Sequence, residues 1–201
     1  MKKKYEEIIN DLSDREILFH LIATQGLLIT ISVILGAIFF DSFSSFYELF
    51  QWSDTRIWTI GGIAGICVVL LDLILMRLLP SSLYDDGGLN VKLFRNKSVW
   101  QIALIAAMVA ITEEILFRGM IQTHVGLVIT SIIFALIHYR YLFNMFLFVN
   151  IVALSFFIGF IYQITENLLV TILMHFMIDF LLGVIIRFSK KDNEQEEGTH
   201  E

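Results

Sequence analysis

Long apolar runs separated by short polar segments dominate the chain. Runs near the length of about 20 residues that a membrane-spanning helix needs cover residues 17–40, 57–79, 100–122, 125–138, 142–163 and 168–188. The run at 125–138 is the shortest of them. Because hydrophobic residues follow one another without alternating, the pattern favours helices over a β-barrel. The sequence therefore predicts an all-α polytopic membrane bundle of about six transmembrane helices.

The polar segments around these runs predict a simple organisation. Residues 1–16 mix charges of both signs with apolar positions, which fits either a helix lying on the membrane surface or a solvated leader. Residues 17–99 hold the first two spans and a loop with a turn at 85–88. The acidic, polar residues 189–201 predict a disordered tail. The first run is too long for the apolar core of a signal peptide, so we expect it to stay as an anchor.

Basic residues favour one orientation of this bundle. If the N-terminus is cytoplasmic, all 14 lysines and arginines except Arg56 and Arg118 fall on cytoplasmic segments or at the cytoplasmic ends of spans. An excess of basic residues marks cytoplasmic segments. We therefore expect a multi-pass protein of the cell membrane with both termini in the cytoplasm.

Composition excludes several other classes. The chain is 57% hydrophobic and 17% charged, whereas soluble domains carry about 25% charged residues. A single cysteine excludes an intrachain disulfide framework. The net charge of −6, with no basic face, argues against a nucleic-acid partner.

Against this background, a few ionisable residues inside the spans attract attention. Each costs about 2.5–3.5 kcal/mol to insert and is therefore a functional candidate by default. The acids are Asp72, Glu113, Glu114 and Asp179, and the basic or imidazole side chains in the second half of the chain are Arg118, His138 and His175.

Helical spacing predicts partners for some of these side chains. Glu114 and Arg118 are four residues apart and can form an ion pair, which leaves Glu113 available. His175 and Asp179 share a face for the same reason. The midpoint between Glu113 and His138 falls in the turn-like residues 123–126, so a reversal there puts both at one depth, roughly 18 Å from the turn. One site could therefore gather Glu113, His138, His175 and Asp179.

Such a set suits hydrolysis of an amide by activated water. A carboxylate beside an imidazole can take a proton from water, and a second imidazole with a carboxyl group can stabilise the oxyanion that forms. Neither a G-x-S-x-G nucleophile motif nor an H-E-x-x-H zinc motif is present. Glu113, His138 and His175 could also hold a divalent metal such as zinc, so the sequence leaves a metal cofactor open.

Three motifs carry a resemblance to a known family. Residues 113–118 read EEILFR, residues 134–138 read FALIH and residues 175–179 read HFMID. Their type, order and spacing resemble the EExxxR, FxxxH and HxxxN/D motifs of the CPBP family. This family is also called Abi or the CAAX protease and bacteriocin-processing family, and it includes the Rce1-type CAAX prenyl endopeptidases. The resemblance covers residues 100–188, which we expect to form the catalytic membrane domain.

The resemblance implies an intramembrane endopeptidase of the glutamate-protease type. Glu113 and His138 would activate water, His175 and Asp179 would form the oxyanion site, and Glu114 and Arg118 would support them. Asp179 departs from the asparagine of Rce1-type enzymes, so it would be protonated or would orient His175 as an acceptor. The implied partner is a peptide or protein substrate, membrane-embedded or lipidated.

Two other functions compete with this interpretation. Some relatives are associated with bacteriocin immunity, so the motifs could be kept structurally in a non-proteolytic membrane protein that binds a partner. A proton-coupled transporter could also use glutamate and histidine relays, but the outer halves of the spans offer few polar residues for a continuous path. Asp72 is expected to be a lone polar residue that faces the bundle.

Overall fold

The computed structural model describes residues 2–138, 141 and 144–189, and over these residues the chain is all-helical. Five helical stretches of this part are long and apolar enough to cross a membrane. They are α2 (Asp14–Phe39), η1 with α4 (Ile57–Gly62 and Ile63–Leu78), α7 with η2 and α8 (Val99–Glu114, Ile115–Gln122 and Thr123–Val125), α10 (Met145–Thr165) and α11 (Leu168–Phe188). The segments η1 and η2 are π-helical. The predicted polytopic membrane bundle is confirmed.

The remaining helices are short. They are α1 (Lys2–Asp11), α3 (Phe43–Tyr47), α5 (Ser81–Tyr84), α6 (Leu89–Phe94) and α9 (Leu127–Ile137). The predicted fourth span corresponds to α9, whose 11 residues extend only about 16 Å. Its start is set by Gly126, which reverses the chain with a φ of +84°, and it ends at His138, where ψ is 38°. The predicted tail at 189–201 lies outside the described residues after Ser189.

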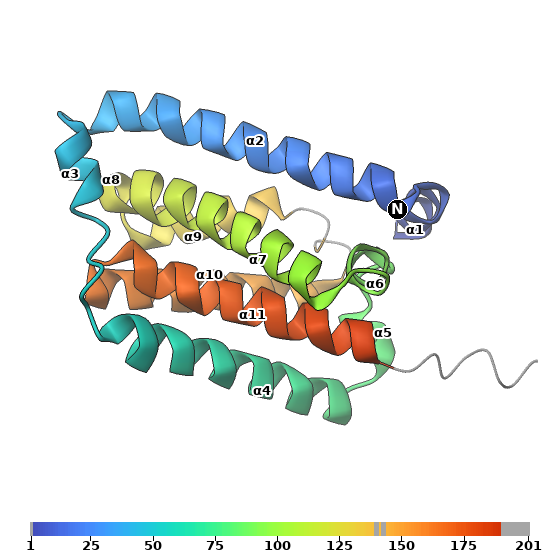
Figure 1. The fold of residues 1–201 in the computed structure, drawn as a ribbon. Coiled ribbons are helices and arrows are strands. Elements are labelled where there is room, and N and C mark those ends of the chain that lie inside the picture. The colour runs from blue at the N-terminus through green and yellow to red at the C-terminus, as the bar shows by residue number, and fades with distance from the viewer. Residues whose placement is uncertain (1, 139–140, 142–143, 190–201) are drawn as a thin grey trace, which may run out of the picture.

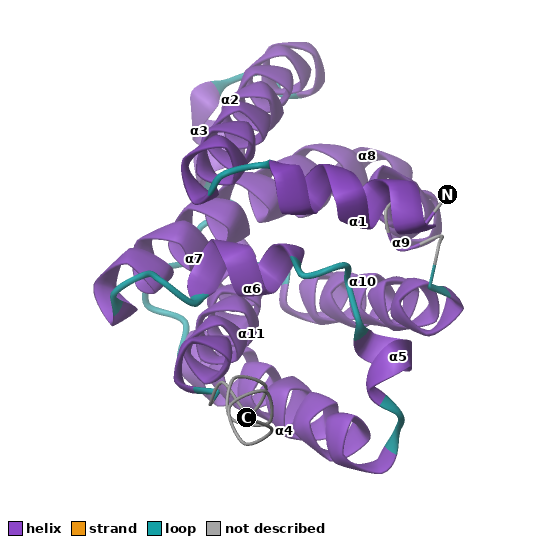
Figure 2. Cartoon of the chain, turned by 90° about the vertical axis from the view of Figure 1, so that its right-hand side faces the viewer, coloured by secondary structure: helices purple, strands orange, loops and turns teal. Residues whose placement is uncertain are grey.

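The helices form a bundle with α11 near its centre. In Figure 1, α2 and α4 lie on opposite sides of the bundle, with α7, α10 and α11 between them. Helix α11 packs against α7, α4, η1 and α10, whereas α2 packs against η2 and α7. Figures 1 and 2 place α1, α5, α6 and the C-terminal end of α11 at the same end of the bundle.

A close approach between two helices fixes the position of α11. Gly61 in η1 and Gly65 in α4 lie directly against its backbone. A β-carbon added at Gly65 would lie 2.9 Å from the carbonyl oxygen of Met174 and 2.8 Å from the Cβ of Met177, and one added at Gly61 would overlap the carbonyl oxygen of Val170. Small residues four positions apart are typical of tight helix packing in membranes. Here they hold the helix that carries His175 and Asp179.

Polar contacts fix the start of α11 and the loop that precedes η1. The Asn167 side chain caps α11, and its Nδ2 donates hydrogen bonds to the carbonyl oxygen of Gln51 at 3.0 Å and to Oδ2 of Asp54 at 3.2 Å. Asp54 also pairs with Arg56 at 2.9 Å. These contacts with Arg56 and Asn167 lower the pKa of Asp54 to about 2, because hydrogen bonds and an adjacent cation favour its charged form.

Candidate active site

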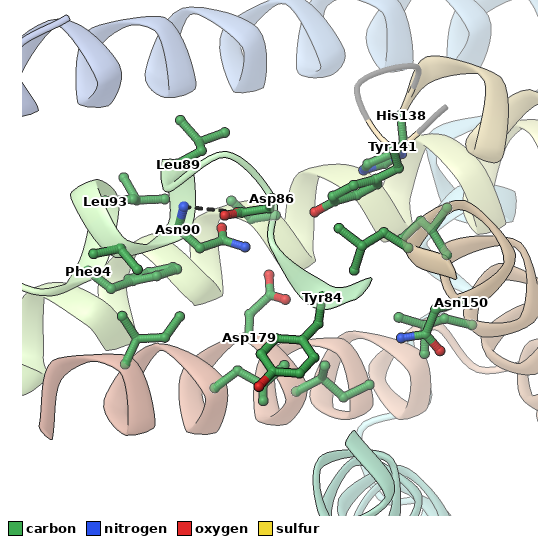
Figure 3. Close-up of a pocket in the computed structure, with 18 of the residues that line it drawn as sticks. Tyr84, Asp86, Leu89, Asn90, Leu93, Phe94, His138, Tyr141, Asn150 and Asp179 are labelled. Carbon is green, nitrogen blue, oxygen red and sulfur yellow. Dashed lines mark hydrogen bonds between the residues drawn. The ribbon is translucent and has the colours of Figure 1, made fainter. Parts of the chain in front are cut away.

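A cavity of about 1330 Å³ lies inside the bundle, next to the α5 and α6 end. Figure 3 shows its wall, with Asp179 on α11 and His138 after α9 among the labelled residues. All four residues that the sequence offered as catalytic line this one cavity: Glu113, His138, His175 and Asp179. They come from three separate helices and from motifs that are up to about 60 residues apart in the chain, so the fold brings the motifs together.

Glu113 is a buried acid in the wall of this cavity. It lies in the last turn of α7 and is 9% exposed. Within the described part of the chain, its carboxylate has no hydrogen bond or ion pair, and its neighbours act on it through longer-range charge alone. A buried carboxylate is normally paired. Glu113 is therefore a candidate for binding water or a substrate.

His138 is oriented by the residue four positions earlier. Its Nδ1 donates a hydrogen bond to the carbonyl oxygen of Phe134 at 2.9 Å, and its ring stacks on the Phe134 ring with centroids 4.4 Å apart. Because Nδ1 is engaged in this way, Nε2 is the ring nitrogen directed elsewhere. The Arg118 guanidinium lies over the Phe134 ring at 5.0 Å. Phe134 thus links the first two motifs.

Glu114 and Arg118 form the ion pair that their spacing predicted. The distance between Arg118 Nε and Glu114 Oε2 is 3.4 Å, and both side chains are fully buried. Arg118 Nη2 also donates to the carbonyl oxygen of Ser155 in α10 at 3.1 Å. The motif crosses from α7 into the π-helical η2, which the sequence analysis did not predict. Wide π-helical turns occur frequently at functional sites.

A contact that the sequence analysis missed joins the first and third motifs. The Nδ1 of His175 lies 2.9 Å from Glu114 Oε1, in a fully buried position. The Nε2 of the same ring lies 3.5 Å from Asp179 Oδ2. His175 is therefore held between two carboxylates. No spacing within a single helix could have indicated the bond to Glu114, because it joins α7 to α11.

The arrangement does not fit the metal site that the sequence left open. Over the described residues, no three His, Cys, Asp or Glu side chains are grouped as metal ligands. Glu113, His138 and His175 share the cavity, but both ring nitrogens of His175 face carboxylates. A metal bound by this set would require His175 to give up one of these contacts.

Asp72 differs from the lone residue that we expected. It lies on α4, and Nδ2 of Asn150 on α10 donates to its Oδ1 at 3.4 Å. Both residues also line the cavity that holds Glu113. The sequence could not place them there, because the cavity is formed by helices that are not neighbours in the chain.

A helical membrane bundle with glutamate and histidine side chains around an internal cavity is the framework expected of an intramembrane protease. Comparisons with known proteins agree with this class. The family model for Type II CAAX prenyl endopeptidase Rce1-like proteins matches residues 95–181. The uncharacterized protein YpbD of Bacillus subtilis (strain 168) is 39% identical over 175 residues, which are 86% of this chain and 93% of that protein. The chain belongs to the Rce1-like CAAX protease family.

Membership of this family confirms the resemblance that the three motifs carried. Together with the five apolar helices, it establishes a multi-pass membrane protein. No solved structure matches the chain.

Proposed function

We propose that this protein is an intramembrane endopeptidase that hydrolyses a peptide bond with water activated by Glu113 and His138. One observation carries the proposal. Glu113 is nine-tenths buried in the wall of the cavity, its carboxylate has no hydrogen-bond or ion-pair partner within the described residues, and His138 and His175 line the same cavity. Family membership supports protease activity as a class.

In the proposed reaction, Glu113 acts as the general base. A water molecule held between its carboxylate and His138 Nε2 attacks the carbonyl carbon of the substrate, and Glu113 takes the proton that the water loses. The bond between the water oxygen and the carbon forms as the carbonyl π bond opens to an oxyanion. When the intermediate collapses, the C–N bond breaks, and the departing amine receives the proton that Glu113 holds.

His175 and Asp179 are the proposed oxyanion donors. Nδ1 of His175 is fixed by Glu114 at 2.9 Å, so the ring can turn only slightly. The 3.5 Å gap between Nε2 and Asp179 is long for a direct hydrogen bond. A proton held by either atom in this gap can therefore be donated to the oxyanion. Preorganised donors of this kind are typically worth on the order of 10²–10³ in kcat.

The substrate class follows from the cavity walls. The wall is built mainly from leucine, isoleucine, valine, methionine and phenylalanine, with polar and charged side chains among them. Apolar walls inside a membrane bundle favour a peptide that is itself membrane-embedded or lipidated. We therefore propose a peptide or protein substrate of this kind, with no nucleic-acid partner.

The test is cleavage by purified protein in liposomes. The probes are internally quenched peptides with an apolar sequence, made with and without a farnesylated cysteine. We expect Glu113→Gln and His138→Ala each to lower kcat on the order of 10²-fold or more. The matched control is Glu48→Gln at the exposed end of α3, which should leave kcat unchanged. Cleavage by Glu113→Gln at the wild-type rate would remove Glu113 from the mechanism, whereas no cleavage of any probe by the wild-type protein would favour the non-proteolytic alternative.

A further inference from the structure

Asp72 is a carboxylate at membrane depth that the proposed reaction does not use. It lies inside α4 and is partly buried. Its direct partner is the neutral side chain of Asn150, at a long 3.4 Å. Carboxylates inside membrane helices are expensive and usually serve a function. An amide can orient such a group, but it cannot neutralise its charge.

Two arginines in the described part of the chain form ion pairs with acids other than Asp72. Arg118 pairs with Glu114, and Arg56 pairs with Asp54. Asp72 has neither of these partners, and it lines the cavity together with Asn150. Figure 3 shows Asn150 on α10, at the cavity wall. A cation that enters this cavity would find in Asp72 an oriented, uncompensated acceptor.

The depth of Asp72 relates it to the candidate catalytic residues. Asp72 lies six residues before the end of α4 at Leu78, about 9 Å along the helix. Glu113 lies 14 residues after the start of α7 at Val99, about 21 Å along it. Both distances are measured from the same end of the bundle. Along the bundle axis, the difference is therefore about 12 Å, which is the length of three or four residues of an extended peptide.

We propose that Asp72, oriented by Asn150, is a substrate-specificity residue that binds a basic side chain three or four residues from the scissile bond. This inference rests on the proposed function. The ammonium or guanidinium group of the substrate would pair with the Asp72 carboxylate inside the cavity, where water screens the pair less than at a surface. A carboxylate of the substrate at the same distance would be repelled.

The experiment uses one quenched host peptide that wild-type protein cleaves. Lysine, norleucine or glutamate replaces each position from two to six residues on either side of the cut. Bilayers are zwitterionic, because anionic lipids would attract the basic peptides themselves. We expect lysine at the third or fourth position to lower KM on the order of tenfold relative to norleucine, and glutamate to raise it. Asp72→Asn should remove this difference.

Three variants distinguish an effect of the Asp72 charge from an effect of the substitution on the structure. Asp41→Asn is the matched control, an exposed acid at the opposite end of the bundle, and it should keep the lysine preference. Asn150→Leu removes the hydrogen bond but keeps the carboxylate, so a weaker preference of the same sign should remain. Asp72→Lys should reverse the preference toward glutamate. An unchanged lysine preference in Asp72→Asn, or equal KM values for the three wild-type peptides, would overturn the proposal.

A binding measurement tests the role of Asp72 separately from the proposed catalytic role of Glu113. Fluorescence anisotropy measures the affinity of the labelled peptides for Glu113→Gln protein, with and without Asp72→Asn. Binding of the norleucine peptide to the double variant shows that the cavity is intact. Cleavage by Glu113→Gln would contradict the catalytic role of Glu113 without touching the charge preference. Equal binding of the lysine and norleucine peptides to Glu113→Gln would contradict the role of Asp72 alone.

Discussion

Glu114 Oε1 and His175 Nδ1 lie 2.9 Å apart, and both side chains are buried. This bond joins α7 to α11 and unites two motifs that are about 60 residues apart in the chain. The second carboxylate oxygen of Glu114 faces Arg118. Glu114 thus contacts both His175 and Arg118, whereas its neighbour Glu113 lines the cavity.

Removing Glu114 should destabilise the bundle. The Glu114→Ala variant leaves the Arg118 guanidinium buried without its counter-charge. Breaking one side of a buried pair typically costs about 3–5 kcal/mol. We expect a lower free energy of unfolding for Glu114→Ala in detergent, measured by denaturant titration. Glu48→Ala, at an exposed site, is the control. A variant as stable as the wild type would mean that water replaces the carboxylate at this site.

Phe134 should affect catalysis through His138. Its ring stacks on the imidazole at 4.4 Å and is almost fully buried. Phe134→Leu keeps an apolar side chain but loses the flat aromatic surface that orients the imidazole ring of His138. We expect kcat to fall on the order of tenfold with KM little changed, because a misplaced catalytic group slows the chemical step. The neighbouring Leu136→Ala, at an exposed site, serves as the control. A change confined to KM would contradict an orienting role.

The glycines between α4 and α11 should tolerate no side chain. A methyl group at Gly65 would lie 2.9 Å from the Met174 carbonyl oxygen, and overpacking of this kind costs about 1–3 kcal/mol. Gly65→Ala is expected to lower both stability and cleavage, because α11 must shift. Gly26→Ala in α2 is the matched control, since nothing lies within 4 Å of the added carbon. Equal thermal midpoints for the two variants would contradict the close packing.

Acid should loosen the loop that holds the start of α11. The pKa of Asp54 is about 2 in the folded protein and 3.8 ordinarily. A lowered folded pKa means that the contribution of Asp54 to stability is complete above the ordinary value and is lost as the pH falls toward 2. We expect the thermal midpoint of the wild type to fall over this interval more steeply than that of Asp54→Asn. Parallel curves would show that Asp54 does not stabilise the fold.

Much of the architecture was predictable, because the lipid environment imposes a simple rule on the sequence of a membrane protein. Backbone groups in lipid must be paired within a helix, so continuous apolar runs identify the spans. The Glu114–Arg118 pair was predictable for a related reason, since it lies within one helical segment. The motif resemblance identified the family, which the comparisons confirm. The catalytic roles of Glu113 and His138 stay predictions.

Other features depend on contacts between helices and were not predictable from the sequence. The bond from Glu114 to His175 and the pairing of Asp72 with Asn150 each join different helices. The π-helical turn around Arg118 has no simple sequence signal. The fourth span was predicted to end at about His138, but composition could not show that α9 would pack against α10 and η2.

The short length of α9 has a consequence for water. Helix α9 ends at Ile137, about 16 Å from its start, so the backbone of its last turn lies partway through the bilayer. Lipid tails offer no hydrogen bonds, and such backbone is tolerated only where it is enclosed by protein or meets a hydrated space. The end of α9 must therefore be either enclosed by protein or hydrated. Water that solvated this end would lie beside the His138 imidazole, which we propose uses water as a reactant.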